Sequence, residues 1–381
     1  MKRLGWILVC VSLIWGLLPM QVRAADLEAE AKSALLMDVA TGTILFEQNS
    51  HEPLAPASVT KVMTMLLIME AIDSGKIGWG DAVTASEAAA AKGGSQVFLK
   101  VGESMTVEDM VKSIAVSSAN DCACAMAEHL AGSEAAFVEN MNSRAKELGM
   151  NDTHFVNCTG LDDAEDASAH RTSAHDIALM SRELLKNHPD ITKFTTIWMD
   201  SIRNGEFGLS NTNKMVRFYS GCTGLKTGFT RGAGYCLSAS AQRDGLQLIA
   251  VVMGCETTQK RFAACKSMLD YGFANFALIQ PELPPEAAVP VKLGITDSVK
   301  AVPASDGSML IDKGQKNLVT TQVTLDEEVT APVSQGQRLG TMTVKAGEQI
   351  LAEIPMVAEA AVEKLTWGQM FGRLMRKVCM K

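Results

Sequence analysis

The pattern of hydrophobic and polar residues predicts a β-hairpin followed by a buried helix near the start of the chain. Residues 34–39 and 43–46 are strand-like runs, and the turn residues 40–42 between them indicate a hairpin. From Ser58 to Met69 the chain is apolar nearly all round. A helix without a polar face is buried in the middle of a domain. We therefore expect a central helix that begins near Ser58.

Later segments predict more helices and a pair of consecutive strands. Thr106 and the acidic residues after it have the pattern of a helix N-terminus. Helices are expected near 107–117, 123–130, 137–148, 172–185 and 261–274. The runs 235–241 and 246–254 are strand-like and are joined by turn residues at 243–245. The chain is thus expected to have an α+β fold.

The proline-rich stretch at 280–286 is the clearest domain boundary. Its prolines cannot continue a helix or a central strand. A chain of 381 residues is also too long for one typical core. We expect a main domain at 25–280 and a small β-rich domain at 281–360, because short β-type runs such as 317–325 follow the boundary.

The two ends of the chain have patterns of their own. Residues 1–24 have a positive start, an apolar run and small residues before Ala24, as in a cleaved export signal. The alternative is a retained membrane anchor, but the run is shorter than the ~20 residues that span a bilayer. We expect cleavage after Ala24 and a mature protein that works outside the cytoplasm.

Residues 361–381 are expected to form an amphipathic helix. Its apolar positions are Trp367, Met370, Phe371, Leu374 and Val378. Its basic positions, off that face, are Arg373, Arg376 and Lys377. Apolar bulk with positive charge, in an acidic chain, indicates peripheral membrane association through residues 363–381. The alternative is a helix that docks on the protein's own surface.

Composition and charge mainly exclude certain classes of function. The chain is 47% hydrophobic and 20% charged, as in ordinary globular proteins, and its net charge of −8 argues against general nucleic-acid binding. Its nine cysteines are scattered and lack the clustered spacing of a metal site. We expect buried free thiols, no metal and no cofactor.

Candidate chemistry begins where the central helix is expected to start. Ser58 and Lys61 are three residues apart and would lie on one helix face. The lysine could then take the serine proton, provided that burial or a neighbouring cation lowers its pKa. The same spacing recurs at Ser143 and Lys146, in a segment that has the pattern of a solvated helix. The spacing alone is therefore not specific.

Two further motifs follow in order, Ser118-Ala119-Asn120 and Lys226-Thr227-Gly228. Each could by itself be a helix cap or the start of a strand. With Ser58 and Lys61 they match the motif trio of β-lactamases and penicillin-binding proteins. In acyl transfer Ser58 would be the nucleophile and Lys61 the proton acceptor.

The remaining motif residues have types that suit substrate binding and proton transfer. Ser118 could relay a proton to the leaving amine, and Asn120 could bind a peptide backbone. Lys226 would attract a carboxylate and lower the pKa of the catalytic base. Thr227 would add a hydroxyl group for that carboxylate, and Gly228 would leave room for substrate.

The backbone N–H groups of Ser58 and Phe229 are candidates for an oxyanion hole.

The chain resembles the low-molecular-mass penicillin-binding proteins of the D-alanyl-D-alanine carboxypeptidase type, peptidase family S11. The segments that carry the resemblance are 54–61, 118–121, 154–157 with 160–161, and 224–230. The resemblance implies a five-stranded antiparallel sheet flanked by helices, with a helical subdomain that holds the Ser-x-x-Lys motif. It also places Arg261 near the substrate carboxylate.

The implied activity is removal of the terminal D-alanine from peptidoglycan pentapeptide stems through an acyl-enzyme. The implied location of the exported protein is the outer face of the bacterial cytoplasmic membrane, in the periplasm or cell-wall space. β-Lactam antibiotics would then be inhibitors that bind covalently. Three alternatives stay open at this point: a β-lactamase, a transpeptidase or DD-endopeptidase on the same site, and a wall-binding scaffold without activity. A β-lactamase needs a carboxylate that activates water, and Glu165 is the nearest candidate.

Overall fold

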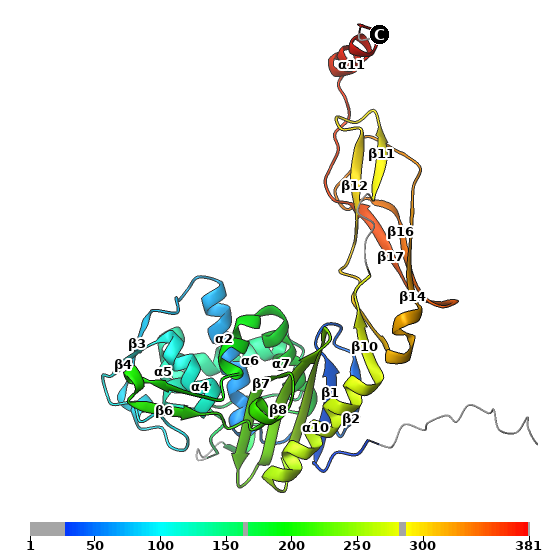
Figure 1. Ribbon diagram of the computed structural model, residues 1–381. Coiled ribbons are helices and arrows are strands. Elements are labelled where there is room, and N and C mark those ends of the chain that lie inside the picture. Colours follow the sequence, from blue (N-terminus) through cyan, green and yellow to red (C-terminus); the bar gives the residue numbers. More distant parts are fainter. Residues whose placement is uncertain (1–26, 163–166, 282–286, 380–381) are drawn as a thin grey trace, which may run out of the picture.

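The computed structural model describes residues 27–162, 167–281 and 287–379, apart from the side chains of residues 167 and 377–379. The predicted export signal at 1–24 lies outside the described residues. An α+β region is followed by an elongated β-rich region and a C-terminal helix (Figure 1). The predicted fold class is therefore confirmed.

A five-stranded antiparallel sheet lies at the centre of the first region, with the strand order β2-β1-β9-β8-β7. Its strands are β1 (Ser33–Asp38), β2 (Ile44–Gln48), β7 (Cys222–Thr230), β8 (Gly234–Arg243) and β9 (Leu246–Cys255). The predicted hairpins β1–β2 and β8–β9 are confirmed. Strand β7 is at one edge, so one side of its backbone has no neighbouring strand of this sheet.

Helices pack on both faces of this sheet. The main ones are α2 (Lys61–Asp73), α4 (Val107–Ser117), α5 (Asn120–Ala131), α6 (Glu134–Glu147), α7 (Ala174–Asn187) and α10 (Thr258–Asn275). Alternate residues of the central strands belong to two separate cores: Leu35 belongs to the core that includes residues of α2 and α7, whereas Leu36 belongs to the core that includes residues of α10. The helical cluster lies on the face opposite α10 (Figure 1).

Short elements complete this region. They are the helices α3 (Glu87–Ala90), α8 (Thr192–Thr195) and α9 (Met215–Phe218), the hairpin β3 (Ala82–Thr84) with β4 (Ser104–Thr106), and the hairpin β5 (Met199–Ile202) with β6 (Phe207–Ser210). The 3₁₀ turns are η1 (Ala57–Thr60), η2 (Ala167–Ala169), η3 (Pro189–Ile191) and η4 (Arg203–Gly205).

Helix α2 is the buried helix that the sequence predicted. Every residue from Lys61 to Leu66 is buried, and nearly all of the helix is enclosed by its neighbours. Its start differs from the expectation, because the first turn at Ser58 is the 3₁₀ turn η1 and the α-helix begins at Lys61. Ala57, with a φ of 49°, begins this tighter turn.

The C-terminal region joins the first one through β10 (Phe276–Ile279), which pairs with β13 (Met309–Asp312). Its main sheet has six strands in the order β14-β16-β17-β12-β11-β15. These are β11 (Ala288–Lys292), β12 (Ser298–Pro303), β14 (Val319–Leu325), β15 (Val329–Thr330), β16 (Arg338–Ala346) and β17 (Gln349–Ala358), with the 3₁₀ turn η5 (Lys313–Leu318) before β14. Residues 282–286 of the proline-rich stretch lie outside the described residues.

Helix α11 (Trp367–Cys379) lies at the end of the molecule that is remote from the five-stranded sheet (Figure 1). Within the described ranges, no helix is long and apolar enough to cross a bilayer. The described cysteine side chains are all free, and all except that of Cys222 are buried. The prediction of buried free thiols is therefore confirmed for the described cysteine side chains other than that of Cys222, which is half-buried.

The buried core around α2 predicts a clear difference between two adjacent leucines. Leu66 is fully buried and Leu67 only partly, so Leu66→Ala should lower the free energy of unfolding by about 2–5 kcal/mol and Leu67→Ala by less. Urea unfolding of both variants measures this. Equal decreases in the free energy of unfolding for the two variants would contradict the described position of the helix.

Candidate active site

The turn η1 and the start of α2 bring the first predicted pair together. The Lys61 ammonium nitrogen lies 3.1 Å from the hydroxyl oxygen of Ser58. The same nitrogen donates to the backbone carbonyl of Thr159 at 2.8 Å. Lys61 is fully buried, whereas Ser58 is partly exposed. The predicted nucleophile is thus accessible from outside, whereas the amine beside it is enclosed by protein.

The environment of Lys61 gives this amine the properties of a base. Burial lowers its pKa from 10.5 to about 7, and the opposing effects of Cys158 and Asp121 are smaller. The sequence allowed two causes for this lowering, burial and a neighbouring cation, and named Lys226 as the cation. Burial is the main cause, and the repulsion between the two ammonium groups contributes to a lowered pKa of Lys226, second to the burial of Lys226 itself.

The second motif lies at the junction of α4 and α5. Ser118 ends α4 in the left-handed region with a φ of 64°, and Asn120 is the first residue of α5. Among the described residues, the Ser118 hydroxyl and the Asn120 carbonyl oxygen are buried without a hydrogen-bond partner. The Asn120 amide nitrogen donates to the Gly93 carbonyl at 2.7 Å, which fixes its orientation. Buried polar atoms of this kind suit groups that bind a substrate.

Asp121, next to this motif, holds the neighbouring loop in place. Its buried carboxylate accepts hydrogen bonds from the backbone N–H groups of Val97 and Leu99, at 3.1 and 3.0 Å. Phe98 between them has a φ of 57° and a side chain that is 68% exposed. The carboxylate therefore stabilises a strained turn beside Asn120.

The third motif lies on the edge strand β7. Lys226 is buried, and its ammonium donates to the Thr227 carbonyl at 2.8 Å. The Thr227 hydroxyl donates to the Thr212 hydroxyl at 2.7 Å. A Cβ atom on Gly228 would lie 3.1 Å from the Ser58 nitrogen and 2.6 Å from the Pro56 carbonyl oxygen. Glycine is thus required where β7 meets the nucleophile turn.

Two further predicted residues, Phe229 and Arg261, lie next to Gly228. The Phe229 ring is 51% exposed and stacks on Tyr235, with 4.3 Å between the ring centroids. Arg261, on α10, is buried and donates to the Gly228 carbonyl at 3.2 Å. Burial lowers the pKa of this guanidinium group. Arg261 therefore supports β7 directly at the motif.

The second Ser-x-x-Lys pair is placed differently. Ser143 and Lys146 are exposed on α6. Two hydrogen-bond partners of the site were not predicted from the sequence: the Thr159 carbonyl, which accepts from Lys61, and the Thr212 hydroxyl, which accepts from Thr227. A backbone carbonyl has no side-chain signal, and Thr212 is separated from Thr227 along the chain by a short helix and a turn.

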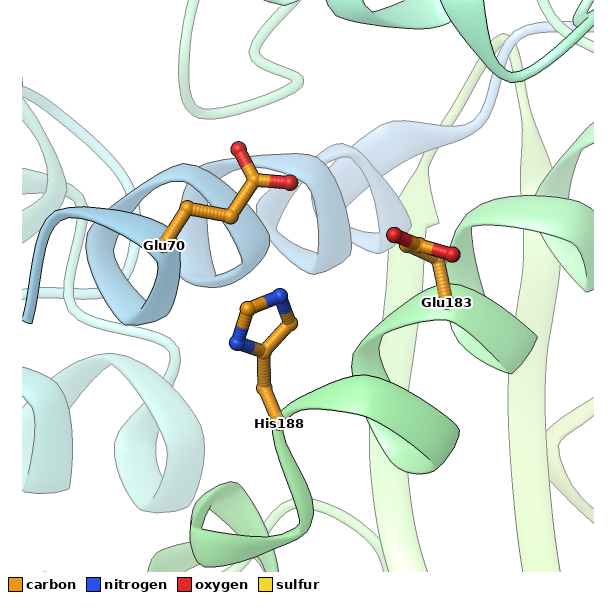
Figure 2. A group of neighbouring side chains, drawn as sticks. All are labelled: Glu70, Glu183 and His188. Carbon is orange, nitrogen blue, oxygen red and sulfur yellow. The ribbon is translucent and has the colours of Figure 1, made fainter. Parts of the chain in front are cut away.

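One group of side chains could hold a metal ion among the described residues, and it lies away from this site. The ligand atoms of Glu70, Glu183 and His188 are within 4.8 Å of one another, and Figure 2 shows the imidazole facing both carboxylates. The Arg144 guanidinium, however, donates to both carboxylates at 2.7 Å, and His188 pairs with Asp73. These ion pairs explain the cluster without a metal.

Two family models match the chain, D-alanyl-D-alanine carboxypeptidase over residues 20–257 and penicillin-binding protein 5, C-terminal domain, over residues 282–364. The D-alanyl-D-alanine carboxypeptidase DacF of Bacillus subtilis is 44% identical over 348 residues, which cover 90% of this chain and 88% of that protein. DacC of Escherichia coli is 34% identical over 365 residues, covering 92% and 88%.

Solved structures agree with this result. Penicillin-binding protein 5 of Haemophilus influenzae has a TM-score of 0.74 and 30% identity, covering 88% of this chain and 98% of that one. The ampicillin-bound penicillin-binding protein D2 of Listeria monocytogenes has a TM-score of 0.59 and 31% identity, covering 65% and 99%.

The lowered pKa of Lys61 predicts the pH dependence of the reaction with penicillin. Only the neutral amine accepts a proton, so the acylation rate should rise about tenfold per pH unit below pH 7 and level off above it. Stopped-flow measurements with a chromogenic penicillin test this. Lys146→Met, which alters the exposed second pair, should leave the profile unchanged, and a flat wild-type profile between about pH 5 and pH 9 would contradict the role of Lys61.

Proposed function

The chain belongs to the D-alanyl-D-alanine carboxypeptidase family, the S11 group of low-molecular-mass penicillin-binding proteins, and we propose that its catalysis proceeds through an acyl ester on Ser58. It is a serine-type carboxypeptidase, which separates it from the β-lactamase and scaffold alternatives. The observation that carries the proposal is the 3.1 Å contact between the Ser58 hydroxyl and the buried Lys61 amine.

In the proposed acylation step, neutral Lys61 takes the proton of Ser58 while the serine oxygen attacks the carbonyl carbon of the penultimate D-alanine. The negative charge that develops on the carbonyl oxygen is bound by the backbone N–H groups of Ser58 and Phe229. Ser118 passes the proton to the leaving amine as the carbon–nitrogen bond breaks, which releases the terminal D-alanine. Water then hydrolyses the ester and restores Ser58.

Substrate binding is proposed on the free edge of β7. A stem peptide can lie there as an added strand, because Gly228 has no side chain in the way. Asn120 has a buried carbonyl oxygen that can accept a backbone N–H group of this peptide. Lys226 and Thr227 supply the positive charge and the hydroxyl group for the terminal carboxylate.

Arg261 is kept in the proposal with a supporting role, since its guanidinium holds the Gly228 carbonyl. The natural substrate is proposed to be the pentapeptide stem of peptidoglycan. A cavity of about 310 Å³ beside Ala57, lined also by Leu161 and Arg171, offers room for the more distant part of this stem.

We also propose that the protein is exported through residues 1–24 and associates with the outer face of the cytoplasmic membrane. Helix α11 supports this, because Trp367, Phe371 and Leu374 are 88%, 65% and 61% exposed. Large apolar side chains at this exposure, on a helix that also carries arginines, suit insertion into a lipid interface.

The proposed nucleophile is tested by mass spectrometry of the protein after reaction with penicillin. We expect one adduct, on the peptide that contains Ser58, and none in Ser58→Ala. Ser143→Ala should react as the wild type does, because Ser143 is on the exposed face of α6. An adduct on Ser143, or on no serine, would overturn the proposal.

The membrane proposal is tested with sedimentation of the mature protein, residues 25–381, on anionic vesicles. Phe371→Asp should reduce the bound fraction about tenfold or more, because it puts a charge on the apolar face. Ile350→Asp is the matched control, since Ile350 is 53% exposed on β17 but lies outside α11. Equal binding of Phe371→Asp and the wild type would contradict membrane insertion of α11.

A further inference from the structure

The peptide unit between Ala57 and Ser58 has hydrogen-bonding groups on opposite sides. It is a trans peptide, so its carbonyl group and its N–H group point in opposite directions. The N–H group is that of Ser58, which the proposed mechanism uses to bind the oxyanion. The carbonyl group is that of Ala57, which is buried. Any contact that fixes this carbonyl therefore also fixes the direction of the Ser58 N–H group.

A chain of buried hydrogen bonds ends on this carbonyl. The Thr60 hydroxyl donates to the Ala57 carbonyl oxygen at 2.9 Å. The same hydroxyl lies 2.8 Å from the Nε2 atom of His170, which is 110 positions further along the chain. Both side chains are buried, at 0% and 4% exposure. The contact therefore links the loop after α6 to the nucleophile turn.

The proton positions along this chain follow from its far end. The backbone N–H of Val156 donates to Nδ1 of His170 at 3.1 Å, so Nδ1 is the acceptor nitrogen. In a neutral imidazole the proton then resides on Nε2 and is donated to the Thr60 oxygen. The Thr60 proton is in turn directed to the Ala57 carbonyl, and all donors point the same way.

Gly160 and Phe155 pack closely on this group of hydrogen bonds. Gly160 has a φ of 81° and packs directly on the Ala57 carbonyl. A Cβ atom at Gly160 would lie 1.9 Å from the Ala57 carbonyl oxygen and 2.7 Å from the Thr60 hydroxyl. The Phe155 ring packs against the imidazole, with 5.7 Å between centroids. These contacts help to hold the hydrogen bonds from His170 to Thr60 and from Thr60 to Ala57 in the arrangement described.

We propose that His170 and Thr60 are positioning residues for the oxyanion hole. They hold the Ala57–Ser58 peptide plane so that its N–H group points at the reacting carbonyl oxygen. A carbonyl that accepts a hydrogen bond also polarises the N–H group of its own peptide unit, because hydrogen bonds in a chain strengthen one another. The inference rests on the proposed role of Ser58 and extends it to two residues that act through the Ala57 carbonyl.

The position of Ala57 explains why such support is needed. Its φ of 49° is a strained conformation for a residue with a side chain. Without the Thr60 hydroxyl, the peptide plane can rotate and relieve this strain, and the Ser58 N–H group then loses its direction. Loss of a complete oxyanion-hole donor costs ~10²–10³ in rate, so a misdirected donor should cost about tenfold or more.

The test compares Thr60→Val with Thr60→Ser by acylation with penicillin and by turnover of a D-alanyl-D-alanine peptide. Thr60→Val keeps the shape and removes the hydroxyl, so acylation and kcat should fall about tenfold or more with KM unchanged. Thr60→Ser should restore the rate. His170→Leu should be slow, and His170→Gln should recover part of the rate through its amide N–H group.

Two further measurements separate positioning from general destabilisation. The infrared band of the ester carbonyl in the penicilloyl enzyme should move to higher wavenumber in Thr60→Val and return in Thr60→Ser, because the oxyanion hole weakens this bond. Thr195→Val is the matched control. Thr195 is also buried, and its hydroxyl donates to the backbone carbonyl of Thr223 at 2.6 Å, which is not part of the hydrogen bonds from His170 to Ala57. It should acylate at the wild-type rate.

The outcomes distinguish this inference from the function on which it rests. If Thr60→Val acylates Ser58 at the wild-type rate with an unchanged carbonyl band, the inference is wrong and the role of Ser58 stands. The inference is also wrong if Thr195→Val is slowed equally. If the wild type forms no adduct on Ser58, the proposed function fails instead.

Discussion

The burial of the Lys61 amine is the constraint on which the site depends. A charged ammonium group is costly to bury, and the fold meets this by lowering the pKa of Lys61 to about 7. Among the residues that the structure describes, the amine forms hydrogen bonds with the Ser58 hydroxyl and the Thr159 carbonyl. The same burial that destabilises the charged form therefore favours a neutral amine beside Ser58, as the proposed role of Lys61 as a base requires. It is possible because α2 is apolar on nearly every side.

Two glycines, one on β7 and one in the loop before η2, pack on the turn that holds Ser58. Gly228 of β7 contacts the backbone at Pro56 and Ser58, and Gly160 contacts the Ala57 carbonyl. Neither position has space for a Cβ atom, so the sheet edge and the loop before η2 close directly on the turn. The result is a strained turn at Ala57 that its surroundings keep in place. Arg261 also stabilises β7 at this point, because its guanidinium donates a hydrogen bond to the Gly228 carbonyl.

The second region separates the site from the helix that we propose to bind lipid. Strands β10 and β13 join the two regions, and the six-stranded sheet extends from there to α11 (Figure 1). The catalytic sheet and α11 therefore lie at opposite ends of the molecule. With α11 in a membrane, this arrangement would hold β7 and its substrate edge away from the lipid surface, where wall peptides can reach it.

Local patterns in the sequence determined much of this protein. The β1–β2 and β8–β9 hairpins, the buried α2, the Thr106 cap and the solvated helix around Ser143 all follow from neighbouring residues, because such patterns act over one or two turns. The order of the three motifs also determined the family. These signals are independent of how the elements pack.

Only the tertiary structure decided how the motifs cooperate. Burial, not Lys226, is the main cause of the lowered pKa of Lys61, and burial depends on the packing of α2 against distant segments. The partners Thr159 and Ala57 contribute backbone carbonyls, which are the same for every residue type and leave no trace in a sequence. His170 reaches Thr60 across a long loop, and no local pattern encodes a contact between such distant positions.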